Sequence, residues 1–450
     1  MVRHDDALLV DLAATRADAI IDSLDRRIAA QLDAILHHPK FQRLERAWRS
    51  LAFLVERTNF RENIEIAFYP CTLDELRVDL VRSGAPARES AFFAVTARGA
   101  TDRPYGAILA DFEFDPTPED ITLLERIAEV GTCSLAPFIA AASPGFFGIE
   151  DRRAIGTVDL LAHFAAHHRA FAALRDQASA SLLGLTVGRF LLRAPFAVAR
   201  EATETLGGFT YDETARAEDL AWGLAVVAFA TRLTSSFAKY RWCPNIVGRA
   251  DGLIEDLPRA PEGAISPLDA NLGERTEYDL SEEGFIPLSF VDATSAGFFS
   301  ARSLMKPKRF GNSEEARAAE FNHRLGTELP YVFISTRIGQ YLKVVHRSFQ
   351  INDPEALVPG APPRRVEKPS WATTAVDDER ELNDWAGQYV ADREVVPPAL
   401  RGRRPLRKVQ VIVRDSTDGE AWRSFDLRLR PHFKHMGAFF TLSLKGTLDP

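Results

Sequence analysis

Apolar residues recur at helical spacing through the first part of the chain. Between residues 15 and 36 they step by three and four, and Thr15 stands where an N-cap is expected. Pro39 then opens a second stretch of the same spacing, because proline is favoured in the first turn of a helix. The two stripes consist of Ile21, Leu24, Ile28, Leu32 and Ile35, and of Phe41, Leu44, Trp48, Leu51 and Val55. The pattern predicts a helical hairpin over residues 1–60 whose apolar faces must pack against something else.

After residue 61 the pattern changes to short apolar runs that alternate with helical stretches. Strands are predicted at residues 64–70, 90–97, 105–114, 184–196 and 282–291. Helices are predicted at residues 119–142, 219–239, 313–328 and 331–347, with a loop at residues 252–265. Because strands that alternate with helices are typical of a layered α/β structure, we expect an α/β body over residues 61–350.

A proline-rich segment, residues 351–376, separates this body from the end of the chain and is predicted to be a linker or an insertion. Its prolines are Pro354, Pro359, Pro362, Pro363 and Pro369. A short helix is predicted over residues 378–393. Three runs of period two follow, made of Val409, Val411 and Val413, of Phe425, Leu427 and Leu429, and of Ala438, Phe440, Leu442 and Leu444. Since such alternation is what a half-buried strand requires, residues 377–450 are predicted to form a helix with an antiparallel sheet, and the fold class is α/β (α+β).

The composition is that of a globular protein whose charge is unevenly distributed. The chain has 450 residues, and its three cysteines are too few for a disulfide framework. Its net charge of −8 disfavours general nucleic-acid binding. The first residues lack the apolar run of a signal peptide, and the apolar stretch at residues 220–230 is too short to span a membrane, so a cytoplasmic location is expected. Residues 401–450 carry eleven Lys and Arg against five Asp and Glu. This basic end indicates either an acidic protein partner or a solvated sheet face.

The chain lacks the common short motifs of catalysis. It contains no Gly-Lys pair, which excludes a phosphate-binding P-loop, and no H-E-x-x-H, C-x-x-C or G-x-S-x-G motif. His163 and His167 are four residues apart and could reach one metal ion from a helix, which leaves a metal-dependent hydrolase as an alternative to a solvated helix face. Asp111 and Glu113 share one strand face, which favours the outward face of an edge strand over acid–base chemistry. We predict no catalytic site, no cofactor and no metal.

The stronger candidates are surfaces that bind a partner. Leu382, Trp385 and Tyr389 form one stripe on the predicted helix at residues 378–393, and such a stripe is either an interface or a part of the core. The basic end and the closing sheet add further positions. The candidate partner-binding residues are Leu382, Trp385, Tyr389, Arg403, Arg404, Val409, Val411, Val413, Leu427, Leu429, Phe440 and Leu442.

Several long segments occur along the chain in a characteristic order. They are ILHHPKFQRLERAWRSL at residues 35–51, GFFGIED at 145–151, FATRLTSSFAKYRWCPNIVG at 229–248, EEGFIPL at 282–288 and ELNDWAGQYVADRE at 381–394, followed by RRPLR and RPHFK before strands. In this order they resemble the large subunit of the type VI secretion contractile sheath. The resemblance implies a core like that of phage-tail sheaths and a structural protein that works by repacking of subunits rather than by catalysis.

The same resemblance implies the partners of the chain. The large subunit pairs with a small sheath subunit and with further copies of itself around a ring-forming inner-tube protein, and contraction drives effector delivery. A baseplate and a disassembly ATPase act on the sheath indirectly, and neither nucleic acid nor membrane insertion is involved. Extended arms tie neighbouring protomers together by adding strands to each other's terminal sheet.

Three features depart from the family pattern. The leader that carries the donor arm before residues 15–36 is almost absent, and residues 351–376 look inserted. Gly188 stands where proline is usual, and Gly339 and Gln340 stand where Ala and His are usual. These departures favour, as an alternative, a sheath-associated cap or adaptor that does not polymerise. Such a chain would accept a strand without donating one and would form short assemblies.

Overall fold

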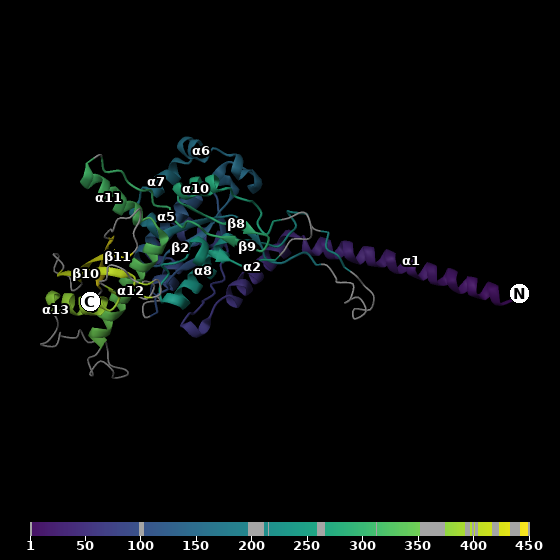
Figure 1. Ribbon diagram of the computed structural model, residues 1–450, viewed down its shortest axis with the longest axis horizontal. Helices are drawn as coiled ribbons and strands as arrows, with labels where there is room; N and C mark the ends of the chain where they lie inside the picture. Colours follow the sequence, from purple (N-terminus) through teal and green to yellow (C-terminus); the bar gives the residue numbers. More distant parts are fainter. Residues whose placement is uncertain are drawn as a thin grey trace.

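The computed structural model describes residues 2–98, 103–196, 211–214, 216–258, 266–311, 313–351, 374–391, 397, 400, 404–415, 423–432 and 442–448. It is a mixed structure of helices and sheets, as predicted, in which a projecting N-terminal helix leads into an α/β body and then into a C-terminal sheet (Figure 1). Residues 352–373, most of the predicted linker, lie outside the described part of the chain.

Two helices, α1 (Val2–Leu36) and α2 (Pro39–Glu56), form the N-terminal part. The predicted start at Thr15 is wrong, because residues 2–36 contain neither Gly nor Pro and the helix continues through this position. His38 caps α2 by accepting a hydrogen bond from the amide of Lys40 at 3.2 Å. The predicted hairpin is wrong in its packing, because α1 extends away from the body and α2 continues into it (Figure 1).

A four-stranded parallel sheet lies at the centre of the body. Its strands are β1 (Ile108–Phe114), β2 (Phe138–Ala142), β3 (Leu183–Val187) and β7 (Phe285–Pro287), in the order β1-β2-β3-β7. Helix α5 (Pro118–Ser134) packs on one face, and α8 (Ala225–Tyr240) packs on the other. The predicted α/β layer is therefore confirmed, with apolar side chains on both faces of its central strands.

Four predictions in the body are wrong, each for a local reason. The helix predicted at residues 219–239 begins only at Ala225, because residues 222–224 pair as a strand instead. Residues 64–70 pair with no strand in the described part of the chain. Residues 90–97 are helical, because the Ser90 hydroxyl caps the first turn by accepting from the amide of Phe93. The helix predicted at residues 119–142 ends at Ser134, and β2 follows it. A strand buried on both faces is continuously apolar, so periodicity does not separate it from a buried helix.

The predicted strand at residues 184–196 is two strands, β3 and β4 (Arg189–Leu191), which meet at Gly188 with a φ of 105°. Small antiparallel sheets pair β4 with β5 (Trp222–Leu224), and β9 (Ser295–Gly297) with both β6 (Leu253–Ile254) and β8 (Ser289–Asp292). The remaining helices of the body are α3 (Leu73–Arg77), α4 (Ala91–Phe93), α6 (Leu160–Ala166), α7 (Arg169–Arg175), α9 (Gly248–Asp251), α10 (Glu274–Glu282) and α11 (Glu314–Leu325). These elements surround the central sheet.

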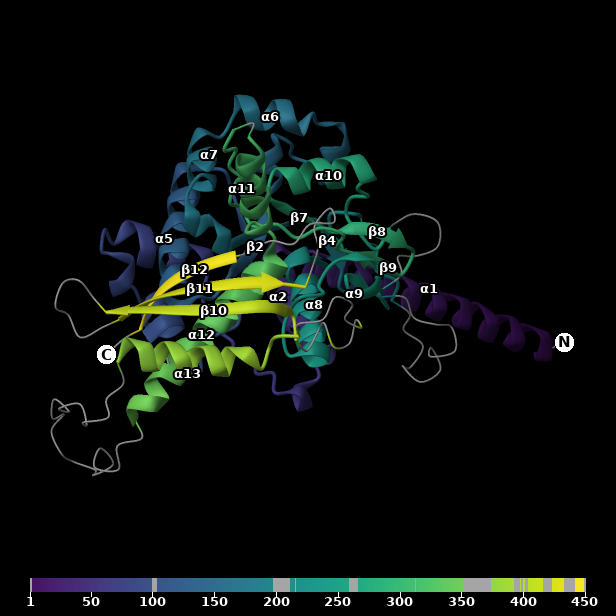
Figure 2. The same ribbon diagram turned by 60° about the vertical axis from the view of Figure 1, so that its left-hand side comes forward.

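Helix α12 (Leu329–Ile351) joins the body to the C-terminal part. Its first turn packs in the core of the body, and Ile334, Ile338 and Leu342 pack in the core of the terminal sheet. That sheet is antiparallel, as predicted, and consists of β10 (Leu406–Asp415), β11 (Arg423–Pro431) and β12 (Leu442–Leu448). Helix α13 (Ala375–Gly387) lies beside it, so that α12 and α13 flank the sheet (Figure 2).

Candidate functional site: the closing sheet and helix α13

Helix α13 begins with a complete capping box. The Thr374 hydroxyl accepts from the amide of Asp377, and the Asp377 carboxylate accepts from the Thr374 amide at 3.1 Å. One face of the helix buries Leu382 and Ala386 completely. This fixes α13 against the terminal sheet, and its other side chains are held in defined positions.

Two side chains of α13 occupy the outer edge of β10. The carboxamide of Asn383 accepts from the Val411 amide at 2.8 Å and donates to the Val411 carbonyl at 2.7 Å. The carboxylate of Glu379 accepts from the Val413 amide at 3.1 Å. The amide group of Asn383 thus replaces a peptide unit of a neighbouring strand. In this stretch the edge of β10 is closed to a further strand.

The opposite edge of the sheet is β12. Its inner side pairs with β11 from Leu429 opposite Leu442 to Arg423 opposite Leu448. Among the described residues no strand pairs with the outer side of β12. Among the described residues, the outer edge of β10 is therefore occupied by side chains of α13, whereas that of β12 carries no strand.

Five of the twelve candidate partner-binding residues lie inside the chain's own core. Leu382, Val411 and Leu427 are 0% exposed, and Leu429 and Val413 are nearly as buried. Val409 is partly buried against the same cluster. These side chains hold the sheet to α12 and α13, and they are buried rather than presented to a partner.

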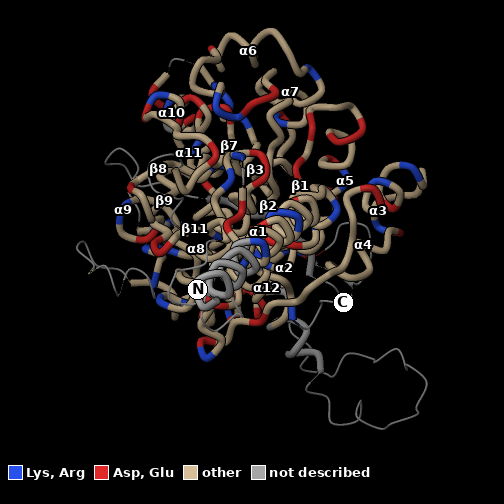
Figure 3. Tube along the Cα trace, turned by 90° about the vertical axis from the view of Figure 1, so that its right-hand side faces the viewer, with Lys and Arg blue, Asp and Glu red and all other residues tan. Residues whose placement is uncertain are grey.

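The remaining candidates are less buried or lie outside the described residues. Arg404 is exposed just before β10, and its amide donates to the Leu400 carbonyl at 2.7 Å. Arg403 and Phe440 lie outside the described part of the chain, and only the backbone of Leu442 is described. Over the face that carries α1, basic and acidic residues are interspersed (Figure 3). The basic excess of residues 401–450 is a count along the sequence, and part of these residues lies outside the described part of the chain, so the basic surface stays a prediction.

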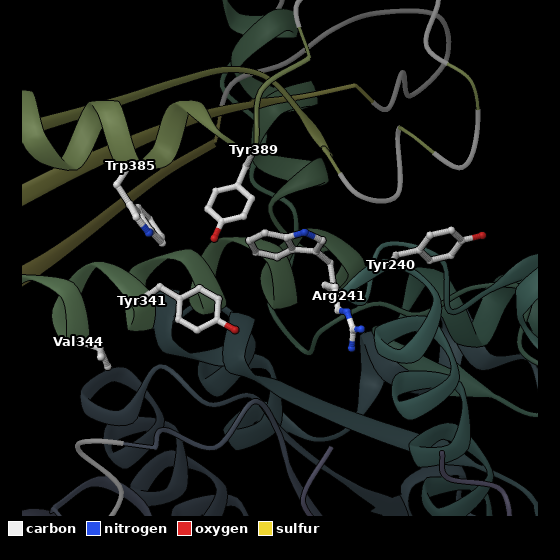
Figure 4. A pocket seen from close by; sticks show the side chains of 7 residues that line it. Tyr240, Arg241, Tyr341, Val344, Trp385 and Tyr389 are labelled. Carbon is white, nitrogen blue, oxygen red and sulfur yellow. The ribbon is translucent and has the colours of Figure 1, made fainter. Parts of the chain in front are cut away.

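Trp385 on α13 and Tyr389 just beyond its end are partly buried against the same apolar cluster as Leu382, which also contains Trp242. Their rings lie 5.2 Å apart, and Tyr389 also contacts the ring of Trp242 at 4.9 Å. Burial raises the pKa of the Tyr389 hydroxyl. Figure 4 shows both side chains pointing from α13 into a pocket that they share with Tyr341 of α12.

The histidines of the hydrolase alternative are not arranged as metal ligands. His163 lies on α6, and its Nε2 atom is 3.0 Å from the Phe146 carbonyl and 3.2 Å from Nε2 of His168. His167 ends α6 and turns its Nδ1 atom toward the His163 carbonyl. No group of three or more His, Cys, Asp or Glu side chains in the described residues could hold a metal ion.

The carboxyl ends of the parallel strands, where α/β sheets often bind ligands, are filled by ion pairs. The Arg152 guanidinium is buried there between Glu113 and Asp269. Asp111 faces α2 from edge strand β1, with its carboxylate 3.8 Å from Nε of Arg46, and burial raises the pKa of Asp111 to about 6. Glu113 and Asp269 thus compensate the buried charge of Arg152, whereas burial disfavours the ionised form of Asp111.

Sequence reasoning did not identify Asn383 and Glu379 as functional. The available signal was the pair itself, two polar side chains four residues apart on the helix that precedes an edge strand. Neither residue type is unusual on a helix surface, so the pairing with β10 becomes visible only in the folded chain.

Known proteins resemble this chain in both its body and its C-terminal part. Residues 18–305 match the family described as EvpB/VC_A0108, tail sheath N-terminal domain, and residues 370–448 match its tail sheath gpW/gp25-like domain. The chain is 28% identical over 463 residues to the type VI secretion system sheath protein TssC1 of Pseudomonas aeruginosa, an alignment that covers 98% of this chain and 88% of that protein. No helix in the described residues has the length and apolar character needed to cross a membrane.

Proposed function

Because the chain belongs to the EvpB/VC_A0108 tail sheath family, we propose that it is a structural subunit of a type VI secretion contractile sheath. In this role it pairs with a small sheath subunit, assembles with further copies of itself around an inner tube, and contracts to drive effector delivery. The sheath lies in the cytoplasm. No step of this function requires a cofactor, because the work comes from repacking of subunits.

The terminal sheet supports this proposal through its two unequal edges. Asn383 and Glu379 of α13 occupy the edge of β10, whereas β12 has an outer edge with no strand on it among the described residues. A sheet with one closed and one open edge accepts strands from one direction only. We infer that the arm of a neighbouring protomer adds to β12.

The N-terminal helices support the proposal through their exposed apolar stripes. Twelve of the twenty-three large apolar residues that are exposed in the described part of the chain lie between residues 20 and 69. On α1, Leu24 and Ile28 are each 47% exposed, and on α2 Trp48 is 64% exposed. A soluble monomer rarely leaves so continuous an apolar surface in water. We infer that the small subunit covers these stripes.

The test is co-expression with the small subunit, followed by copurification and electron microscopy. Aspartate at both Leu24 and Ile28 should abolish copurification, because two charges would enter the apolar interface. Ala30→Asp is the matched control, since residue 30 lies on the opposite face of α1. Copurification of the double variant at the wild-type level would contradict the proposed interface.

Electron microscopy then separates the sheath role from that of a cap or adaptor. Long, regular tubes from the wild-type pair are the expected result for a sheath subunit. Short or terminating assemblies from the same pair would favour the cap. The observation that carries the proposal is the family membership over both parts of the chain.

A further inference from the structure

A pocket of about 460 Å³ lies where the C-terminal part meets the body. It is bounded by α12, by α13 and by the residues that end α8 (Figure 4). Its lining residues are Tyr240, Arg241, Trp242, Tyr341, Val344, Trp385 and Tyr389. The volume is within the range of pockets that bind small molecules or short peptide segments.

Four of the lining rings form a closed series. The ring centroids are 4.9 Å apart for Trp242 and Tyr389, 5.2 Å for Tyr389 and Trp385, 6.2 Å for Trp385 and Tyr341, and 6.4 Å for Tyr341 and Trp242. Neighbouring rings are close to perpendicular, with interplanar angles between 72° and 87°. Ring faces therefore alternate with ring edges around the pocket, which creates slots for flat apolar groups.

The polar groups of the pocket are mainly hydrogen-bond donors. In the described part of the chain, the hydroxyls of Tyr341 and Tyr389 and the indole N–H of Trp385 form no hydrogen bond that would occupy them. The Arg241 guanidinium is paired with the carboxylate of Glu62 at 2.7 Å, and no carboxylate is among the described lining residues. Aromatic faces combined with free N–H and O–H donors fit an apolar chain that is rich in carbonyl acceptors, as in the grooves that recognise proline-rich peptides.

We propose that this pocket binds the proline-rich segment of the same chain, residues 352–373. The segment leaves from the end of α12 at Ile351 and returns at Thr374, and both of the helices that it connects line the pocket. Val344 is two turns before Ile351, about 10 Å along the helix. A chain of this length spans up to about 70 Å when extended, so the segment reaches the pocket from either end.

The segment carries as many acidic as basic residues, but the charge beside its proline pair is basic, and this local complementarity supports the occupant. Helix α13 carries five acidic residues against Arg380 alone, a net charge of −4 by count. In the segment, Arg364 and Arg365 directly follow the Pro362-Pro363 pair. A proline pair bound against the rings of α13 would place these two arginines beside an acidic helix, where opposite charges attract.

The experiment uses a fluorescein-labelled peptide of residues 357–366 (LVPGAPPRRV) and the full-length chain. Wild-type protein should bind the peptide weakly, because its own segment occupies the pocket at a high effective concentration. Replacing Pro359, Pro362 and Pro363 together by Ser should release the segment and increase peptide affinity at least tenfold, measured by fluorescence anisotropy.

Pocket variants in this triple background identify the site. Trp385→Leu should reduce peptide affinity at least tenfold, and Tyr341→Phe, which removes a single hydroxyl, should reduce it about twofold to tenfold. Trp48→Leu is the matched control, because Trp48 is an exposed tryptophan outside the pocket and its loss should leave the affinity unchanged. Circular dichroism of each variant shows whether it is folded, and Tyr341→Phe serves where Trp385→Leu is not.

Three results would overturn the proposal. Equal binding of the peptide to wild-type protein and to the triple variant would mean that the chain's own segment does not occupy the pocket. Absence of binding to the folded triple variant would mean that the pocket does not recognise this sequence. Peptide binding by wild-type protein that weakens as protein concentration rises would assign the occupant to a second copy of the chain.

Discussion

Both ends of the chain carry apolar stripes, yet the chain buries only those at its C-terminal end. In the terminal sheet, Val411 and Leu427 are 0% exposed and Leu429 is 1% exposed. On α1, Leu24 and Ile28 are each 47% exposed. Periodicity identifies the face of an element that avoids water, but it does not identify what covers that face. The C-terminal stripes complete a core within the chain, whereas the N-terminal stripes are exposed, and there we propose that a partner binds.

The same substitution made at both ends tests this difference, and it should have the largest effect on stability. Leu427→Asp loses a fully buried leucine and buries a charge, which should destabilise the terminal core by on the order of 5 kcal/mol and abolish copurification with the small subunit. Leu24→Asp should leave the thermal unfolding of the isolated chain almost unchanged. Calorimetry of both variants gives the comparison.

Arg428→Asp is the control for Leu427→Asp, because Arg428 is exposed on the other face of the same strand. A Leu427→Asp variant that is well folded and still copurifies would show that the terminal sheet is not the joining surface. A Leu24→Asp variant that melts as early as Leu427→Asp would show that the chain itself covers the stripe of α1.

An element could be predicted from the sequence where the spacing of its apolar residues fits either a helix or a strand, but not both. Strands β10 and β11 and helices α2, α11 and α12 were predicted because alternation or helical spacing extends through each of them. Helices α1 and α8 were predicted with wrong starts, and the third predicted run overlaps β12 only at residues 442–444, since residues 438–441 lie outside the described part of the chain. Strand β2 was missed because its five residues are all buried, and its apolar run continued that of α5. Residues 64–70 alternate as a strand does, but no partner strand lies beside them in the described part of the chain. Pairing is a property of the fold, and one strand's pattern does not specify it.

The candidate site was predicted only in part, because the contacts that form it join residues far apart in the sequence. The stripe of Leu382, Trp385 and Tyr389 is on α13 and around its end, but it divides in the structure. Leu382 enters the core, while the two aromatic residues also line the pocket against Trp242, which lies 143 positions before Trp385 in the sequence. The hydrogen bonds of Asn383 to Val411 likewise join residues whose relation depends on tertiary packing.

Removal of the Asn383 carboxamide would make the two sheet edges more alike. Asn383→Ala leaves the Val411 amide and carbonyl without their partners, so the free energy of unfolding should fall by about 3 kcal/mol. The exposed edge of β10 should also promote self-association. Urea denaturation and sedimentation velocity measure the two effects. Gln388→Ala is the control at the C-cap of the same helix, because the side-chain hydrogen bond of Gln388 among the described residues goes to the Trp385 carbonyl and not to the sheet. Unchanged stability of Asn383→Ala would show that α13 does not close this edge.

The attachment of the N-terminal helices to the body has a pH dependence of its own. Burial beneath α2 raises the pKa of Asp111 from 3.8 to about 6, so the folded chain binds a proton more tightly than the unfolded chain does. Stability should therefore fall as the pH rises from about 4 to about 6 and then stay constant. Asp111→Asn removes this contribution and should be more stable than the wild type by about 2 kcal/mol above pH 6, with little difference at pH 4. Urea denaturation at the two pH values checks this, and equal pH profiles for both proteins would contradict it.

The smallest expected effect concerns Arg403 and Arg404, the two arginines that precede β10 in the sequence. They test whether the C-terminal end presents charge to a partner, as we propose that the N-terminal end presents apolar surface. Reversal of Arg403 and Arg404 to Glu should weaken copurification with the small subunit at low salt and have little effect at high salt, because exposed charges are screened. Arg404 is exposed and precedes the core strand, so the fold should tolerate the change with a loss below about 1 kcal/mol. Copurification at low and at high salt, about 50 and about 500 mM, gives the measurement. A loss that is independent of salt would indicate local misfolding at the start of β10, and no loss at either salt concentration would mean that the basic end is a solvated sheet face.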